Sequence, residues 1–370
     1  MSHLHTYPLG CGKTWSIEEI DSYIAQTYCN KNMEKVLPKM VLQPSPRVRK
    51  NESTLYMDAG TGNTKVILYR VNHWDGAHWD VDPETSFEST EICVLDPIAG
   101  NPKLDQLGVD LLATYYRSFA DKAVLGATEW RRRQKPTDPI VDDFCVELED
   151  GGITIVPVDA QDEAMYETTA VKFALTRYNA LFPSKIDAQY YVSAGGGSFQ
   201  LASLSDLSSA VSLPILVQHF ADLFWSQFQK GNGLDDANIW PYVETMKAKI
   251  KTFPVVTKGI LVCMGSMFYS AKHIGLANTP DEFNTHDVHE VLAKMKENIV
   301  AISTLLHDKT QVDPNDKKQI RAYVALQVNH AILRSIAKDD AQILFKRDWK
   351  VQADTFRTTW TFGHFLSQLQ

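Results

Sequence analysis

Short runs of β-branched, aromatic and aliphatic residues alternate along the chain with longer stretches of helical periodicity. Two β-rich runs, TLYMD and KVILYRV, flank a glycine turn within residues 54–71. A second pair of runs with a glycine turn between them spans AQYYVSAGGGSFQLASL at 188–204. Helical patterns dominate 206–250, the strand-like GILVCMG follows at 259–265, and further helical patterns extend to about 345. Strand-rich halves that are each followed by helices predict an α/β protein.

Two further segments carry Asp-Gly turns, which are typical of hairpins. HWDGAHWDV at 73–81 turns between two tryptophans, and FCVELEDGGITIVPV at 144–158 turns at Asp-Gly-Gly. The segment DAQDEAMYETTAVKFALTRYNALF at 159–182 has apolar residues at roughly helical spacing and acids in its first turn, which a helix N-terminus favours. We therefore expect two hairpins and, after the second, a helix.

Length and composition indicate two domains. The 370 residues exceed what one hydrophobic core usually fills, and the 44% that are apolar can supply two cores. The prolines and basic residues before position 51 are typical of a linker. The predicted division is an N-terminal extension and linker over 1–50, a first domain over 51–165 on which 346–370 packs back, and a second domain over 166–345.

The charge and the cysteines argue against several classes of protein. A net charge of −8 disfavours general affinity for nucleic acid or for an anionic membrane. We find no run of eighteen apolar residues and no signal-peptide h-region, so the expected location is the cytoplasm, with export that reads no N-terminal signal as the alternative. Five cysteines without a C-x-x-C pair indicate reduced thiols, not a zinc site or a disulfide framework.

The two glycine turns are alike and suggest a duplication. Glycine allows positive φ and lacks a Cβ, so successive backbone N–H groups of such a turn can point into one concavity and bind phosphate. Neither turn opens directly into a helix, unlike a P-loop or a dinucleotide fingerprint. A glycine hairpin without a ligand explains each turn equally well; two turns, one in each presumed domain, favour a phosphate chain held from both sides. The candidate phosphate-binding residues are Gly60, Thr61, Gly62, Asn63, Thr64 and Lys65 in the first turn, and Gly195, Gly196 and Gly197 in the second.

These motifs resemble those of the apyrase (nucleoside triphosphate diphosphohydrolase) family, within the actin, sugar kinase and heat-shock ATPase superfamily. DAGTGNTKVILYR resembles the first phosphate loop of that family and SAGGGSFQLA the second. LGATEWRR, VDAQDEAMY, MGSMFYSAKHIG and TTWTFGHFLSQL resemble its remaining segments in the same order. The related exopolyphosphatase family shares both loops and the acidic pair, and is the nearest rival. The resemblance implies an α/β fold of two actin-like (ribonuclease H-like) domains with a ligand cleft between them.

The resemblance also implies a role for individual residues. Glu163 corresponds to the catalytic base, and Ser198 and Gln200 to the residues that orient the attacking water. Asp58 corresponds to the residue that holds the hydration shell of a divalent ion, Mg²⁺ or Ca²⁺, and Ser193 occupies the matching metal position of the second loop. The implied substrate is a nucleoside tri- or diphosphate.

Two more positions follow from the same resemblance: Arg132 would contact phosphate, and Tyr269 would offer its ring to the base. Two departures stand out. Ser193 replaces an aspartate, and Phe199 replaces a small hydroxyl residue. They favour an alternative hypothesis, a nucleotide-binding pseudo-enzyme or sensor that docks on a protein partner through residues 1–50. The acidic pair of this segment also contains Asp162, beside Glu163, and the sequence leaves open which of the two faces the cleft.

Overall fold

The computed structural model divides the chain into two units. The first comprises Met1–Asp159 and His364–Gln370, and the second comprises Ala160–Gly363. The predicted boundary at residue 165 falls inside a helix that this division assigns whole to the second unit. The residues that the structure describes are 6–9, 13–16, 53–59, 64–74, 79–82, 86–88, 122–126, 149–150, 152–156, 158–195, 198–213, 221, 225–226, 248, 255–307, 317–351 and 354–368.

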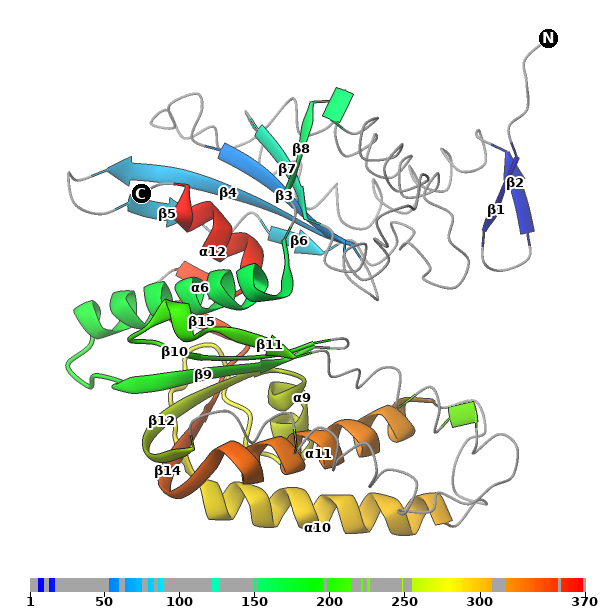
Figure 1. The fold of residues 1–370 in the computed structure, drawn as a ribbon, viewed down its shortest axis with the longest axis vertical. Coiled ribbons are helices and arrows are strands. Elements are labelled where there is room, and N and C mark those ends of the chain that lie inside the picture. Colours follow the sequence, from blue (N-terminus) through cyan, green and yellow to red (C-terminus); the bar gives the residue numbers. More distant parts are fainter. Residues whose placement is uncertain are drawn as a thin grey trace. The chain divides into compact units, whose positions relative to one another are not determined.

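A mixed sheet forms the body of the first unit (Figure 1). Its strands are β3 (Ser53–Ala59), β4 (Thr64–Trp74), β5 (Trp79–Asp82), β6 (Ser86–Glu88), β7 (Lys122–Gly126) and β8 (Ile153–Val156). The order is β5-β4-β3-β7-β8, with β6 beside β4. β3 and β4 form an antiparallel hairpin, whereas β3, β7 and β8 run parallel. Within the extension, β1 (Thr6–Leu9) pairs with β2 (Lys13–Ser16).

Two of the predicted hairpins are confirmed in the first unit. Around the first glycine turn, β3 pairs along its whole length with the first part of β4, and Trp74 of β4 is the backbone partner of Trp79 of β5. The third predicted hairpin, at Asp-Gly-Gly, falls partly outside the described residues, which leave out 144–148 and Gly151. Glu149 and Asp150 are helical, Gly152 closes that turn at φ 84° by donating its N–H to the carbonyl of Glu149, and β8 then pairs in parallel with β7.

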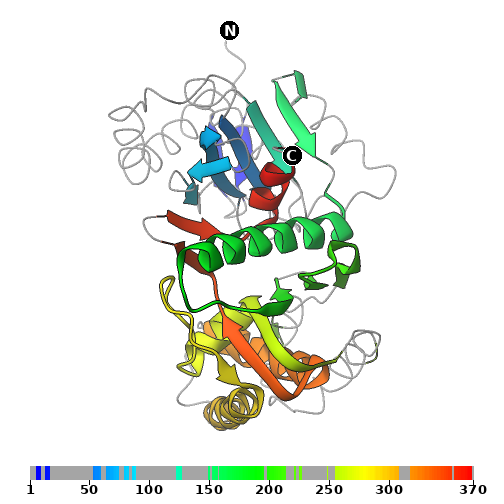
Figure 2. The ribbon, with the colours of Figure 1, turned by 90° about the vertical axis from the view of Figure 1, so that its left-hand side faces the viewer.

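The second unit places a sheet between helices (Figures 1 and 2). Its strands are β9 (Ala188–Ala194), β10 (Phe199–Ser203), β11 (Val211–Leu213), β12 (Val256–Gly265), β13 (His286–Asp287) and β14 (Ala337–Phe345), in the order β11-β10-β9-β12-β14-β13. The other elements are α6 (Ala160–Leu181), η2 (Leu207–Ser209), α9 (Ser266–His273), α10 (Val288–His307), α11 (Lys317–Ile336), β15 (Asp348–Val351), β16 (Asp354–Arg357) and α12 (Trp360–Ser367). As predicted, residues 160–181 form a helix, α6.

The two faces of this sheet have different neighbours. Helix α6 lies on one face, and α10 and α11 cover the other (Figures 1 and 2). Side chains alternate along β9, so Val192 and Ala194 join the core that α9, α10 and α11 complete. Tyr191 and Ser193 point the opposite way, towards α6, and Tyr191 donates a hydrogen bond to Glu167 of that helix. Polar groups therefore gather between the sheet and α6.

The two sheets repeat the same five-strand plan. In each, the first strand pairs antiparallel with the second and parallel with the fourth, and the order is third, second, first, fourth, fifth. β3, β4, β5, β7 and β8 in the first unit correspond in this way to β9, β10, β11, β12 and β14 in the second. The similarity between the two glycine turns thus extends to the topology around them, as a duplication predicts.

The C-terminal helix α12 packs closely against α6 within the second unit. A Cβ on Gly363 would lie 1.7 Å from the carbonyl oxygen of Tyr166, so only a residue without a side chain fits there. The ring of Phe362 meets Phe173 of α6 edge-on at 5.6 Å between centroids. In the first unit, the phenol of Tyr56 on β3 lies 2.6 Å from Nδ1 of His364. In the parts of the chain that the structure describes, no helix is long and apolar enough to cross a membrane.

Candidate active site

Asp58 occupies the end of the central strand of the first sheet. It is buried at 7% exposure, and β3 sets it beside Lys65 of β4 on one side and Gly126 of β7 on the other. The backbones of Thr64 and Lys65 begin β4 directly after the glycine turn. The remaining phosphate-binding candidates of this unit, Gly60, Thr61, Gly62, Asn63 and Arg132, lie outside the described residues.

Ser193 is the counterpart of Asp58 in the second sheet. It stands at the same point of the corresponding central strand, followed by one alanine and then by glycine, as Asp58 is. Its neighbours across the strands are Gln200 on β10 and Met264 on β12. The exchange of an acid for a serine therefore falls at the position that the duplication makes equivalent to Asp58.

The second glycine turn presents two paired polar side chains. Nε2 of Gln200 donates to Oγ of Ser198 at 2.7 Å, and both residues are buried. The N–H of Gly195 donates to the carbonyl of Ser198 at 2.7 Å, which closes the hairpin. Gly196 and Gly197 lie outside the described residues.

Phe199 does not enter this turn as a ligand-facing residue. Its side chain is fully buried in the core with Ala194, its partner across the hairpin. Because side chains alternate along a strand, Ser198 and Gln200 project from the face opposite to Phe199. A large apolar residue is therefore compatible with the polar pair.

Glu163 lies in the first turn of α6, on the side of the sheet where Gln200 and Ser193 project. Its side chain is buried at 9% exposure, whereas the neighbouring Asp162 is half-buried. The charge of Glu163 contributes to the raised pKa of the Tyr191 phenol on β9. Of the two acids in the pair, Glu163 is the more enclosed one.

The sequence reasoning missed Glu167 and Tyr191. Burial, followed by the carboxylate of Glu167, raises the pKa of Tyr191 well above its usual value, so its phenol stays protonated and donates to Glu167. The spacing of four residues places Glu163 and Glu167 on one face of α6, and this pattern is the signal that could have revealed the second acid.

Tyr269 is half-exposed on α9 and can serve as a platform for a ring. Its side chain is 53% exposed, and the guanidinium of Arg347 lies 5.9 Å from the centre of its ring. The helix starts after Gly265, at φ 62°, where a Cβ would come within 2.4 Å of the carbonyl oxygen of Ala194. Asn329 holds the other side of α9 through a 2.8 Å hydrogen bond to Ser270. The start of α9 is thus fixed directly beside the second glycine turn.

The described residues contain no group of three or more His, Cys, Asp or Glu side chains that could hold a metal ion. They do contain single buried oxygen donors at the ends of the two central strands, Asp58 and Ser193. Mg²⁺ is often held by one or two carboxylates, with waters and substrate phosphates completing its shell. Within the first unit, the buried carboxylate of Asp58 fits an ion bound in that way.

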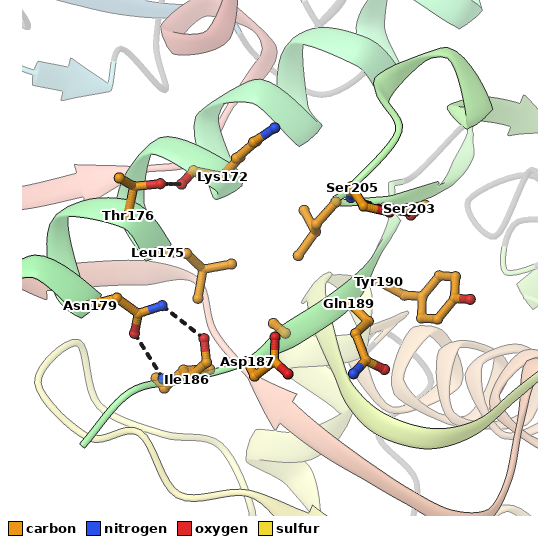
Figure 3. Close-up of a pocket in the computed structure, with 12 residues that line it drawn as sticks. Lys172, Leu175, Thr176, Asn179, Ile186, Asp187, Gln189, Tyr190, Ser203 and Ser205 are labelled. Carbon is orange, nitrogen blue, oxygen red and sulfur yellow. Dashed lines mark hydrogen bonds between the residues drawn. The ribbon is translucent and has the colours of Figure 1, made fainter. Parts of the chain in front are cut away.

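A separate cavity of about 410 Å³ lies at the other end of the β9–β10 hairpin, between this hairpin and the second half of α6 (Figure 3). Tyr190 and Lys172 are among its lining residues. The amide of Asn179 bridges the backbone N–H and carbonyl of Ile186 at 2.8 and 2.9 Å, which ties the helix to the chain entering β9. This cavity does not include the residues of the glycine turn.

No protein-family model matches the chain, and no curated protein matches it in sequence. Among solved structures, it is similar to a Ppx/GppA family member from Aquifex aeolicus, with 14% identity, a TM-score of 0.55, and coverage of 86% of this chain and 97% of that one. A structure of the Aquifex aeolicus PPX-GPPA enzyme gives 15% identity, a TM-score of 0.56, and coverage of 85% and 99%. An exopolyphosphatase from Cytophaga hutchinsonii gives 11% identity, a TM-score of 0.50, and coverage of 86% of this chain and 98% of that one.

These similarities, together with the two sheets of like topology, show the fold. The chain is an α/β protein with two domains of the actin-like (ribonuclease H-like) class, as the sequence predicted. At identities of 15% or less, the likeness shows the fold alone.

Proposed function

We propose that this protein hydrolyses the terminal phosphoanhydride bond of nucleoside tri- or diphosphates. The observation that supports this most directly lies within the second unit: the buried carboxylate of Glu163 stands on the side of the sheet to which the paired Ser198 and Gln200 project. A base and polar groups that orient a water, beside a glycine turn that can bind phosphate, are what anhydride hydrolysis needs.

In the proposed reaction, Glu163 accepts a proton from a water molecule whose oxygen attacks the terminal phosphorus. The new P–O bond forms as the bridging P–O bond breaks, and the bridging oxygen leaves with the shortened phosphate chain. Ser198 and Gln200 orient the water through the pair of polar groups that they form. Backbone N–H groups of the two glycine turns, with Arg132 and Lys65, bind the phosphate oxygens across the proposed cleft.

A divalent ion, Mg²⁺ or Ca²⁺, would be held by Asp58 through its water shell and would neutralise charge on the phosphate chain. Ser193 would meet that shell with a neutral oxygen at the equivalent position of the second unit. The nucleobase would stack on Tyr269, whose exposed ring lies next to the guanidinium of Arg347.

A second candidate is an exopolyphosphatase-like activity. It is favoured by the solved structures of similar fold, which include a Ppx/GppA protein and an exopolyphosphatase. Both candidates use the same base and the same turns, and they differ in the part of the substrate that lies beyond the terminal phosphates. A nucleobase needs the ring of Tyr269, whereas a long polyphosphate does not.

Initial rates of phosphate release from ATP, ADP, GTP and a polyphosphate of defined length separate these candidates. The proposal expects turnover of the nucleotides and little release from polyphosphate. The reverse preference would replace it with the exopolyphosphatase activity. Nucleotide binding without phosphate release from any of them would instead support the sensor hypothesis, in which residues 1–50 dock on a protein partner.

A further inference from the structure

Ser212 on β11 has a buried hydroxyl that the proposed reaction does not use. Its oxygen is shielded from solvent and has no hydrogen-bond partner among the residues that the structure describes. A buried hydroxyl without a partner costs stability, so such a group needs an explanation in a bound water, a ligand or a role in chemistry. The position of Ser212 in the sheet indicates which of these applies.

Ser212 lies directly opposite Gln200, one of the two residues proposed to orient the attacking water. The two residues are partners in the antiparallel register of β10 and β11. Side chains of directly opposite residues point to the same face of a sheet, with Cβ atoms about 4.5–5.5 Å apart. Val211 and Leu213, on either side of Ser212, pack against the core on the other face. The hydroxyl of Ser212 and the carboxamide of Gln200 therefore share the face that α6 covers.

Among the described residues, only one of the two ends of the Gln200 carboxamide makes a hydrogen bond. Nε2 donates to Oγ of Ser198 at 2.7 Å, so Ser198 accepts there and keeps its own proton for the attacking water. A carboxamide turned by 180° would present Oε1 to Ser198 instead and would take up that proton. Because the two orientations have nearly the same shape, a donor on the side of Oε1 is needed to select the first.

We infer that Ser212 is a positioning residue for the proposed hydrolysis, and that its hydroxyl donates through one bound water to Oε1 of Gln200. A water that bridges two buried polar groups is nearly as favourable in enthalpy as a direct hydrogen bond, and it gives Ser212 the partner that the chain does not supply. It also holds the carboxamide in the orientation that leaves the proton of Ser198 to the attacking water. The inference rests on the proposed function, because it assigns a role beside the same Ser198 and Gln200.

Two substitutions at Ser212 test this role. Ser212→Ala removes the hydroxyl and should lower kcat for the preferred nucleotide about fivefold, the effect of one hydrogen bond, with KM changed less than about twofold because other groups bind the phosphates. Ser212→Thr keeps a hydroxyl and should stay within about twofold of the wild-type kcat. The thermal midpoint of Ser212→Ala should not fall, because the hydroxyl that it removes has no partner in the chain.

A second change, at Gln200, gives a readout that a merely structural role of Ser212 would not produce. The carboxylate introduced by Gln200→Glu accepts at both oxygens and has no orientation to select. In a Gln200→Glu background, Ser212→Ala should therefore change kcat less than about twofold. The matched control is Ser203→Ala at the other end of β10, where the hydroxyl already pairs with that of Ser205 at 2.8 Å, and it should leave kcat and KM unchanged.

Crystal structures of the wild type and of Ser212→Ala test the bridge without any turnover. The wild type should show an ordered water within about 3.2 Å of both Oγ of Ser212 and Oε1 of Gln200, and Ser212→Ala should lose it. A wild-type structure in which no water bridges these two atoms would overturn the inference.

The outcomes separate the inference from the proposed function. Equal losses of kcat on Ser212→Ala in the wild-type and Gln200→Glu backgrounds would show a merely structural role and overturn the inference, as would full activity of Ser212→Ala. A wild-type protein that releases no phosphate would end the proposed hydrolysis, and the crystal structures would still decide whether Ser212 holds the carboxamide.

Discussion

The amino group of Lys346, directly after β14, is enclosed within the second unit. Its side chain is fully buried, and Nζ lies 2.9, 2.8 and 2.7 Å from the backbone carbonyl oxygens of Thr279, Pro280 and Glu282. The ring of Phe283 lies 4.0 Å from the same nitrogen. An ammonium group has one N–H for each of the three carbonyls, whereas a neutral amine has two and leaves one carbonyl unpaired.

This charge makes stability depend on pH in a defined direction. Burial lowers the pKa of Lys346 from 10.5 to about 7, against the opposing charges of Asp281, Asp348 and Glu282. Between pH 7 and 10.5 the unfolded chain binds more protons at Lys346 than the folded chain does, so the free energy of unfolding rises with pH. Below pH 7 the amine is charged in both states, and the cost of burying the charge is present in full. At about 1.4 kcal/mol per pH unit, the whole window amounts to about 5 kcal/mol. The carbonyls and the ring favour the ammonium and make this an upper limit.

Lys346→Met removes the charge and leaves three carbonyls without a donor. Each buried carbonyl without a partner costs about 1–3 kcal/mol, which exceeds the desolvation that the change relieves, so we expect a loss of about 3 kcal/mol at pH 7. Because only the wild type gains stability as pH rises, the gap between the two should widen by about 2–3 kcal/mol from pH 7 to pH 9.5. Urea unfolding followed by tryptophan fluorescence at both pH values measures it.

Lys294→Met on the exposed face of α10 is the matched control, and it should change stability by less than about 0.5 kcal/mol at both pH values. A gap between wild type and Lys346→Met that stays constant from pH 7 to pH 9.5 would refute the reasoning about the buried ammonium. A variant as stable as the wild type at pH 7 would refute the reasoning about the three carbonyls.

Three further predictions concern single positions. Gly363→Ala should cost about 3 kcal/mol or more in thermal unfolding, because its Cβ would lie 1.7 Å from the carbonyl oxygen of Tyr166. Gly275→Ala, which has open space around it, should cost about 1 kcal/mol because of its φ of 74°. Equal losses of stability in the two variants would contradict the packing argument. Phe199→Ser, which restores a small hydroxyl residue, should cost about 3–5 kcal/mol in urea unfolding, and a stable variant with raised activity would show that the side chain faces the ligand. Tyr269→Ala should raise KM for nucleotides about tenfold and leave release from polyphosphate unchanged, and an equal effect on both substrates would argue against base stacking.

Local signals in the sequence were enough for the hairpins at the two glycine turns. The alternation of apolar residues and the glycine turns predicted β3–β4 and β9–β10, and the likeness of the two turns predicted the duplicated topology. The alternation of side chains along a strand also predicts the direction of Phe199, because a residue between Ser198 and Gln200 points to the opposite face.

Other features depend on contacts that no local pattern encodes. Asp-Gly-Gly at 150–152 fits the pattern of a hairpin and that of the end of a helical turn, and in the structure Gly152 closes a turn on Glu149 before β8 pairs in parallel with β7. The enclosure of Lys346 needs carbonyls from about 65 residues earlier in the chain. The hydrogen bond from Tyr191 to Glu167 likewise forms only when β9 brings Tyr191 against α6.

Phosphate release by wild type and by Glu163→Gln, measured on the preferred nucleotide with Mg²⁺, with Ca²⁺ and with EDTA, tests the central claim most directly. Glutamine keeps the size and polarity of the buried side chain but cannot accept the proton of the attacking water. The account predicts turnover by the wild type that requires a divalent ion, a loss of at least about 100-fold in kcat for Glu163→Gln, and nearly unchanged nucleotide affinity. Wild-type rates in Glu163→Gln, or no phosphate release by the wild type with either ion, would contradict it.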